Sequence, residues 1–150
     1  MTARRPELRS GLAGTRRYLL SHHEPEEWDR CYAVGIPGRE RPLRLCARCS
    51  GIYPGIALGV ALVSTGALPV VPWLVAVLPA FALLDWARSQ FTARRGSNAA
   101  RTASGFGLGF AYGMGLLGVL RGDARMAIIV VGIGYASLAA TGLWAERRLW

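Results

Sequence analysis

One charge-free run limits the folds that are open to this chain of 150 residues. From Cys49 to Leu84 the sequence contains 36 residues without Asp, Glu, Lys or Arg. As a single helix, this run would be roughly 54 Å long at about 1.5 Å per residue. The hydrocarbon core of a bilayer is only about 30 Å thick. The run therefore predicts two membrane crossings joined by a turn.

A break inside the run supports two crossings. Gly66 and Pro69 stand close together there, and both residue types favour chain reversal. We expect span 1 at about residues 50–65 and span 2 at about residues 70–86. A re-entrant hairpin, which enters and leaves through the same membrane face, is the alternative that this pattern leaves open.

Two more apolar segments follow, and they predict span 3 at about residues 102–120 and span 4 at about residues 126–144. Hydrophobic residues make up 52% of the chain, which is high for a soluble domain of this size. The predicted fold class is all-α: a membrane bundle of about four transmembrane helices at residues 50–150. An irregular, basic Cys/His head at residues 1–49 precedes it.

Glycines repeat at four-residue spacing in two of the predicted spans. They are Gly105, Gly109 and Gly113 in span 3, with Gly55 and Gly59 in span 1. This small-xxx-small pattern lets helix backbones approach closely. It is compatible with packing within one chain and with a homo-oligomer through the Gly-rich faces.

The arginines predict the orientation and the partners. All 18 basic residues are Arg, and 16 of them lie in the head, the loop between spans 2 and 3, and the tail. Positive loops stay in the cytoplasm, so we expect a multi-pass plasma membrane protein with both termini cytoplasmic. The net charge of +9 suggests contact with anionic lipid headgroups of the bilayer. The apolar remainder argues against nucleic acid as a partner.

Cysteines and histidines in the head form the first candidate site. Cys46 and Cys49 make a C-x-x-C pair, Cys31 lies fifteen residues earlier, and His22 and His23 precede it. Two thiolates at this spacing can bind one ion, because the intervening turn lets both sulfurs point inward. With Cys31 and one histidine, the set would hold a structural zinc ion.

Other roles for these cysteines are left open by the sequence. A C-x-x-C pair can be a redox dithiol, although no βαβ pattern of the thioredoxin type surrounds it. A persistent disulfide conflicts with a cytoplasmic head. The thiols can also be inert packing groups, since free Cys is commonly buried.

Polar residues beside spans 2 and 3 form the second candidate site. Asp85 is the sole acid between Glu40 and Asp123, and ionisable residues at membrane depth tend to be functional or paired. A pair with Arg88 is the plain alternative. Asn98 and Arg101 follow at the start of span 3. The predicted topology brings Asp85, Asn98 and Arg101 into the same interfacial layer as the C-x-x-C pair. We therefore regard these three as candidate catalytic residues, with Arg101 facing a headgroup phosphate and Asp85 pairing with Arg101 or with the metal shell.

A resemblance to a known family supports these choices. Residues 46–55, CARCSGIYPG, resemble the hallmark motif of a prokaryotic family of small predicted membrane proteins, domain of unknown function family 2085. Asp85 with Gln90 and residues 97–105, SNAARTASG, are similar to its later elements. The resemblance covers about residues 22–120. Many members carry Cys-His where this chain has Cys31-Tyr32, so the choice of the histidine ligand stays open.

The resemblance implies a membrane fold and supplies no activity. Our leading interpretation is an integral membrane protein of unknown activity with a Cys/His zinc site at the cytoplasmic interface. A membrane-embedded enzyme acting on a lipid or isoprenoid headgroup and a small transporter or metal-handling protein are the alternatives. A closed polar pocket would favour the enzyme, and a polar path through the bundle would favour transport.

Overall fold

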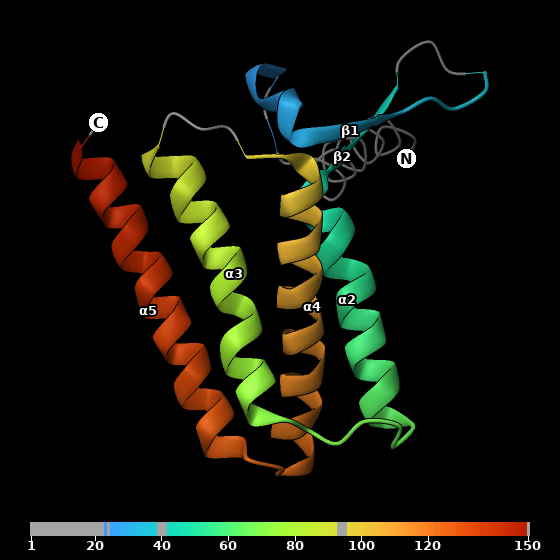
Figure 1. Ribbon diagram of the computed structural model, residues 1–150, viewed down its shortest axis with the longest axis vertical. Coiled ribbons are helices and arrows are strands. Elements are labelled where there is room, and N and C mark those ends of the chain that lie inside the picture. Colours follow the sequence, from blue (N-terminus) through green and yellow to red (C-terminus); the bar gives the residue numbers. More distant parts are fainter. Residues whose placement is uncertain (1–22, 24, 39–41, 93–95, 150) are drawn as a thin grey trace, which may run out of the picture.

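The structure is a computed structural model that describes residues 23, 25–38, 42–92 and 96–149. Four long helices stand side by side, and a short two-stranded hairpin covers one end of the bundle, here called the head end (Figure 1). The helices are α2 (Ala47–Ser64), α3 (Pro72–Phe91), α4 (Asn98–Arg121) and α5 (Arg125–Leu149). Each is long and apolar enough to cross a membrane. The predicted all-α membrane bundle is confirmed.

The charge-free run folds into two helices, as its length predicted. Helix α2 ends at Ser64, and Gly66 then takes a positive φ of 76° that suits a residue without a Cβ. Helix α3 begins with Pro72, where the missing proline N–H has no helical partner to lose. Both helices run the length of the bundle (Figure 1), which is the arrangement of two crossings.

Helices α2 and α4 are joined by a seam of glycines. A Cβ at Gly55 would overlap the carbonyl oxygen of Phe106, and a Cβ at Gly109 would overlap the carbonyl oxygen of Ile52. The same overlap recurs along the seam at Gly51, Gly59, Gly105 and Gly113. The two backbones therefore touch directly, which is how small residues hold helices together in lipid. The glycine faces pack within one chain, the first of the two arrangements that the sequence allowed.

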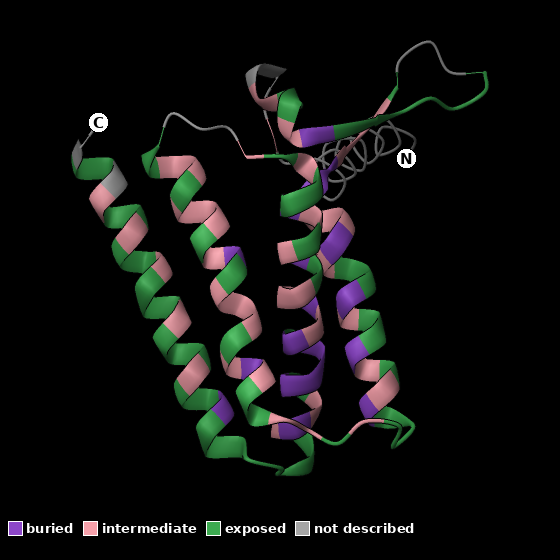
Figure 2. Ribbon diagram, in the orientation of Figure 1, coloured by how far each residue is buried: buried purple, intermediate pink, exposed green. Residues whose placement is uncertain are grey.

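The rest of the bundle is looser. Figure 2 shows buried residues concentrated along α2 and α4, whereas α5 is mostly exposed. Helix α5 is held to α3 by a hydrogen bond from the Tyr135 hydroxyl to the Ala76 carbonyl oxygen, at 2.5 Å. A small buried cluster of Val63, Val75, Met114 and Ile128 lies toward the end opposite the head. The exposed apolar faces are those that would meet lipid tails.

The head contains more regular structure than the sequence predicted. A 3-10 helix η1 (Pro25–Arg30) leads into β1 (Cys31–Val34), which pairs antiparallel with β2 (Leu43–Cys46). The connection between the two strands holds several residues that favour turns, namely Gly35, Pro37, Gly38 and Pro42, whereas Pro25 begins η1. The register places Cys31 opposite Cys46. Strand β2 passes directly into α2, so Cys46 stands at the junction of strand and helix.

The seam yields a direct test of what holds the bundle together. Gly109→Ala would drive a methyl group into the backbone of α2, and we expect it to lower the free energy of unfolding by about 1–3 kcal/mol through overpacking. Gly107→Ala is the matched control on the same helix, since its Cβ would meet Leu78 at an ordinary 3.8 Å. Reversible unfolding in mixed micelles measures both. Equal stability of the two variants would contradict a backbone seam.

Candidate functional site

The three cysteines gather where β1, β2 and α2 meet. Cys46 is the last residue of β2 and the N-cap of α2, and Cys49 follows within the first turn of the helix. Cys31 is the cross-strand partner of Cys46 and lies near enough to Cys49 for an electrostatic interaction. None of the three forms a disulfide bond, and Cys31 and Cys46 are buried. The hairpin register thus joins a cysteine fifteen residues away to the C-x-x-C pair.

His23 turns toward this cysteine cluster. Its Nε2 atom lies 3.5 Å from the Cys46 sulfur, and its Nδ1 atom lies 2.9 Å from a carboxylate oxygen of Glu27. The other carboxylate oxygen of Glu27 forms an ion pair with the Arg30 guanidinium, at a distance of 2.9 Å from its Nη1 atom. A carboxylate that fixes one ring nitrogen and orients the other is the usual support of a metal-ligating histidine. His22, the alternative ligand, lies outside the described residues.

The surroundings of Cys46 favour its thiolate form. A hydrogen bond from the Cys49 thiol, hydrogen bonds from the backbone N–H groups of Cys49 and Arg48, and the contact with His23 lower the pKa of Cys46 to about 4, against the opposing effect of burial. The hydrogen bond from His23 and the charge of Arg30 hold the pKa of Glu27 below its ordinary value. A thiolate is the form of cysteine that binds metals and attacks disulfides.

The four predicted donors share one corner of the structure but do not enclose an ion as they lie. Within the described part of the chain, no group of three or more His, Cys, Asp or Glu side chains is arranged to hold a metal. Among these donors, His23 and Cys46 lie at contact distance, and Cys46 and Cys49 share a hydrogen bond. To enclose an ion, Cys31 and Cys49 would therefore have to adopt other rotamers.

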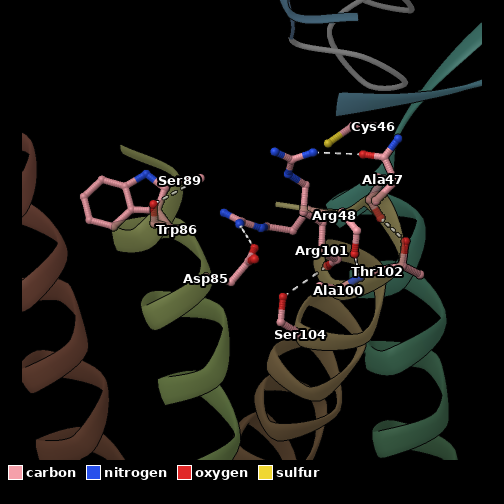
Figure 3. A network of polar contacts seen from close by, with 12 residues as sticks. Cys46, Ala47, Arg48, Asp85, Trp86, Ser89, Ala100, Arg101, Thr102 and Ser104 are labelled. Carbon is pink, nitrogen blue, oxygen red and sulfur yellow. Dashed lines mark hydrogen bonds and ion pairs between the residues drawn. The ribbon is translucent and has the colours of Figure 1, made fainter. Parts of the chain in front are cut away.

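Asp85 is paired with Arg48. The Arg48 guanidinium reaches from α2 to the Asp85 carboxylate on α3 (Figure 3), and the two side chains are only 24% and 16% exposed. The predictions that Asp85 pairs with Arg88 or with Arg101 were wrong. Arg88 belongs to the same helix as Asp85, whereas Arg48 projects across the gap between two helices and buries the charge of Asp85.

Asn98 and Arg101 join α4 to the head. Arg101 is only 5% exposed, and its Nη1 atom donates to the Asn98 side-chain oxygen at 2.9 Å. The Asn98 amide nitrogen in turn donates to the Asp29 carbonyl oxygen, also at 2.9 Å. Ser97 caps α4 by accepting a hydrogen bond from the Ala100 N–H, which fixes the start of the helix that carries Asn98 and Arg101.

A cavity of about 310 Å³ connects the two candidate sites. His23, Cys46 and Cys49 line one side of it, while Arg48 and Arg101 line another. The expected convergence of the C-x-x-C pair and Arg101 on one layer is therefore found, with Asp85 attached through Arg48. Sequence reasoning missed Arg48 and Arg30 as members of this site. The available signal was the place of Arg48, the charged residue between the two cysteines of the motif.

The ion pair between α2 and α3 can be tested by a double-mutant cycle. Asp85→Asn leaves Arg48 half-buried without its counter-charge, and we expect a loss of about 1–3 kcal/mol of stability. Arg48→Gln should cost less in the Asp85→Asn background than in the wild type. The control is Arg88→Gln, whose effect should add to that of Asp85→Asn without coupling. If Asp85→Asn were coupled to Arg88→Gln and not to Arg48→Gln, the pairing of Asp85 with Arg48 would be contradicted.

The fold and the site define a small four-helix membrane protein with a cysteine and arginine cluster at one end of its bundle. A family model described as "Predicted membrane protein (DUF2085)" matches residues 36–115, more than half of the chain. The chain belongs to this family. The match includes β2, α2, α3 and α4 as far as residue 115, and thus the C-x-x-C pair, Asp85 and Arg101, whereas His23 and Cys31 precede it. No curated protein and no solved structure matches the chain.

Proposed function

We propose that this integral membrane protein holds a structural zinc ion through His23, Cys31, Cys46 and Cys49. The observation that carries the proposal is the 3.5 Å separation of the His23 Nε2 atom and the Cys46 sulfur. Nitrogen and sulfur ligands of one tetrahedral zinc lie about 3.6 Å apart, given Zn–N and Zn–S distances of about 2.1 and 2.3 Å. The histidine is thus already at the spacing of a ligand.

The positions of the other donors support the same site. Cys46 and Cys49 share the first turn of α2, and Cys31 faces Cys46 across the hairpin. Three thiolates and one imidazole form a closed Cys₃His set, which leaves no open position for a reacting molecule. The role is therefore structural: the ion would fasten the segment before η1, strand β1 and helix α2 to one point.

Metal analysis of the detergent-purified chain tests the site. We expect about one zinc per chain in the wild type, and loss of that zinc in Cys46→Ser and in His23→Ala. His22→Ala is the matched control, and it should keep the metal. Chelation of the wild type should lower its melting temperature, because the ion binds the folded state.

Two results would contradict the zinc site. One is zinc retained by the Cys46→Ser variant, which would place the metal elsewhere. The other is a metal-free wild type in which mass spectrometry finds a reversible Cys46–Cys49 disulfide. That second result would favour the redox dithiol, whose C-x-x-C pair also begins at a helix N-terminus.

We further propose that the head end faces the cytoplasm at the plasma membrane. The support is the arginine distribution along the sequence, since 16 of 18 belong to the N-terminal head, the loop between spans 2 and 3 and the C-terminal tail, whereas Arg121 and Arg125 flank the turn between α4 and α5. A green fluorescent protein fused after Trp150 should therefore fluoresce in cells. Alkaline phosphatase inserted at Gly66 should be active, because that turn would lie outside. The reverse pattern would contradict the orientation.

An enzyme acting on a lipid headgroup is a second candidate, favoured by the polar cavity beside Arg101. Asp85 is engaged by Arg48, and Asn98 is engaged by Arg101 and Asp29. The cavity therefore supports binding more directly than catalysis. Transport is less well supported, because the middle thirds of α2, α4 and α5 carry no ionisable acid or arginine in the described chain.

A further inference from the structure

Three cavities follow one another along one side of the bundle. The head cavity shares Arg48 and Trp86 with an apolar cavity of about 340 Å³. That second cavity shares Pro79, Leu108 and Tyr135 with a third, apolar one of about 420 Å³. The shared residues show that the three spaces adjoin one another in a row, here called the groove, which is polar at the head end and apolar between α3, α4 and α5.

The polar end of the groove carries an unmatched positive charge. Arg101 is only 5% exposed, and its Nη2 atom has no hydrogen-bond acceptor among the described residues. The same is true of the Nε atom of Arg48. A buried guanidinium N–H without a partner is costly, and a phosphate, with several oxygens and a negative charge, is the acceptor that arginine favours.

The nearby carboxylates do not remove this charge. Glu27 forms an ion pair with Arg30, and Asp85 forms one with Arg48. Arg101 forms no ion pair with any carboxylate of the described chain, and it bonds instead to the neutral amide of Asn98. Arg101 therefore carries a buried positive charge that no carboxylate of the described chain pairs with.

The apolar part of the groove suits a hydrocarbon chain. Its lining by Pro79, Leu108 and Tyr135 continues with Val75 and Ile128 toward the opposite end. Helix α5, which forms one wall, is mostly exposed (Figure 2). In a bilayer this wall would lie at the depth of lipid tails, while the arginines would lie at the depth of headgroups.

We propose that the groove binds an anionic membrane lipid bearing a phosphate group. The phosphate accepts hydrogen bonds from Arg101 and Arg48 at the head end, and one hydrocarbon chain lies between α3, α4 and α5. Because the polar and apolar parts adjoin, a lipid would occupy the whole groove, whereas a free phosphate would occupy only its head end. The proposal does not rest on zinc, because neither arginine belongs to the proposed ligand set.

Lipid binding to the full chain in detergent micelles, followed by native mass spectrometry, tests the groove. The probes are dioleoyl phosphatidic acid, dioleoyl phosphatidylcholine and inorganic phosphate. We expect the first to bind at least about tenfold more tightly than the second, because choline would set a positive charge beside the arginines. Inorganic phosphate should compete only weakly, since it leaves the apolar part empty.

Variants separate the two ends of the groove. Arg101→Gln should weaken phosphatidic acid binding by about tenfold or more. Arg147→Gln, which removes an exposed arginine at the end of α5, is the charge-matched control and should bind as the wild type does. Ala139 lines the apolar part, so Ala139→Trp should narrow it and weaken the binding of the lipid but not of inorganic phosphate. Because it leaves the head intact, this variant keeps the test valid if Arg101→Gln fails to fold.

Several outcomes would overturn the proposal. Equal affinity for phosphatidic acid and phosphatidylcholine would exclude recognition of the headgroup charge. If Arg101→Gln and Arg147→Gln weakened phosphatidic acid binding equally, the binding would depend on the net charge of the protein and not on Arg101. Inorganic phosphate that binds as tightly as the lipid, with no effect of Ala139→Trp, would make the site one for a water-soluble anion.

Discussion

The contact between the backbones of α2 and α4 supports the rest of the structure. In lipid, apolar side chains gain little by meeting one another, so helices associate through close packing. The glycine seam brings the first turn of α2 against the first turns of α4. There the Thr102 hydroxyl donates to the Ala47 carbonyl oxygen at 2.8 Å, and Gly105 lies against Arg48 (Figure 3 shows this region). Because these glycines leave no side chain between α2 and α4, the two helix starts lie close enough for the arginines and the C-x-x-C pair to share one cavity.

Much of the fold could be predicted from the sequence because hydropathy and helix length act locally. The charge-free run, its break at Gly66 and the four spans could be identified without knowing which helices pack against one another. The hairpin was missed because four-residue strands carry little periodic signal, and the turn residues between them dominate the segment. The partner of Asp85 was missed for another reason. Arg88 is close in the chain, but only the packing of α2 against α4, and of α3 beside them, brings Arg48 within reach.

The candidate site was predictable in its membership and not in its contacts. Cys31, Cys46 and Cys49 were recognisable by residue type, and topology placed Arg101 in their layer. The sequence could not choose between His22 and His23, because no helical or strand periodicity around them predicts which side chain points toward the cysteines. It also treated Arg48 as one more topology-setting charge. The contact of the Arg48 carbonyl oxygen with Gly105, the ion pair of Arg48 with Asp85 and the place of Arg48 in the cavity all depend on tertiary packing.

The direct passage of β2 into α2 has a mechanical consequence. Cys46 ends the strand and Ala47 begins the helix, so no flexible residue separates the hairpin from the first membrane-spanning segment. The hairpin should therefore tilt together with α2. A change in bilayer thickness that alters the tilt of α2 would turn the hairpin with it and shift Cys31 and His23 relative to Arg101 on α4. The orientation of the head would thereby depend on the thickness of the surrounding membrane.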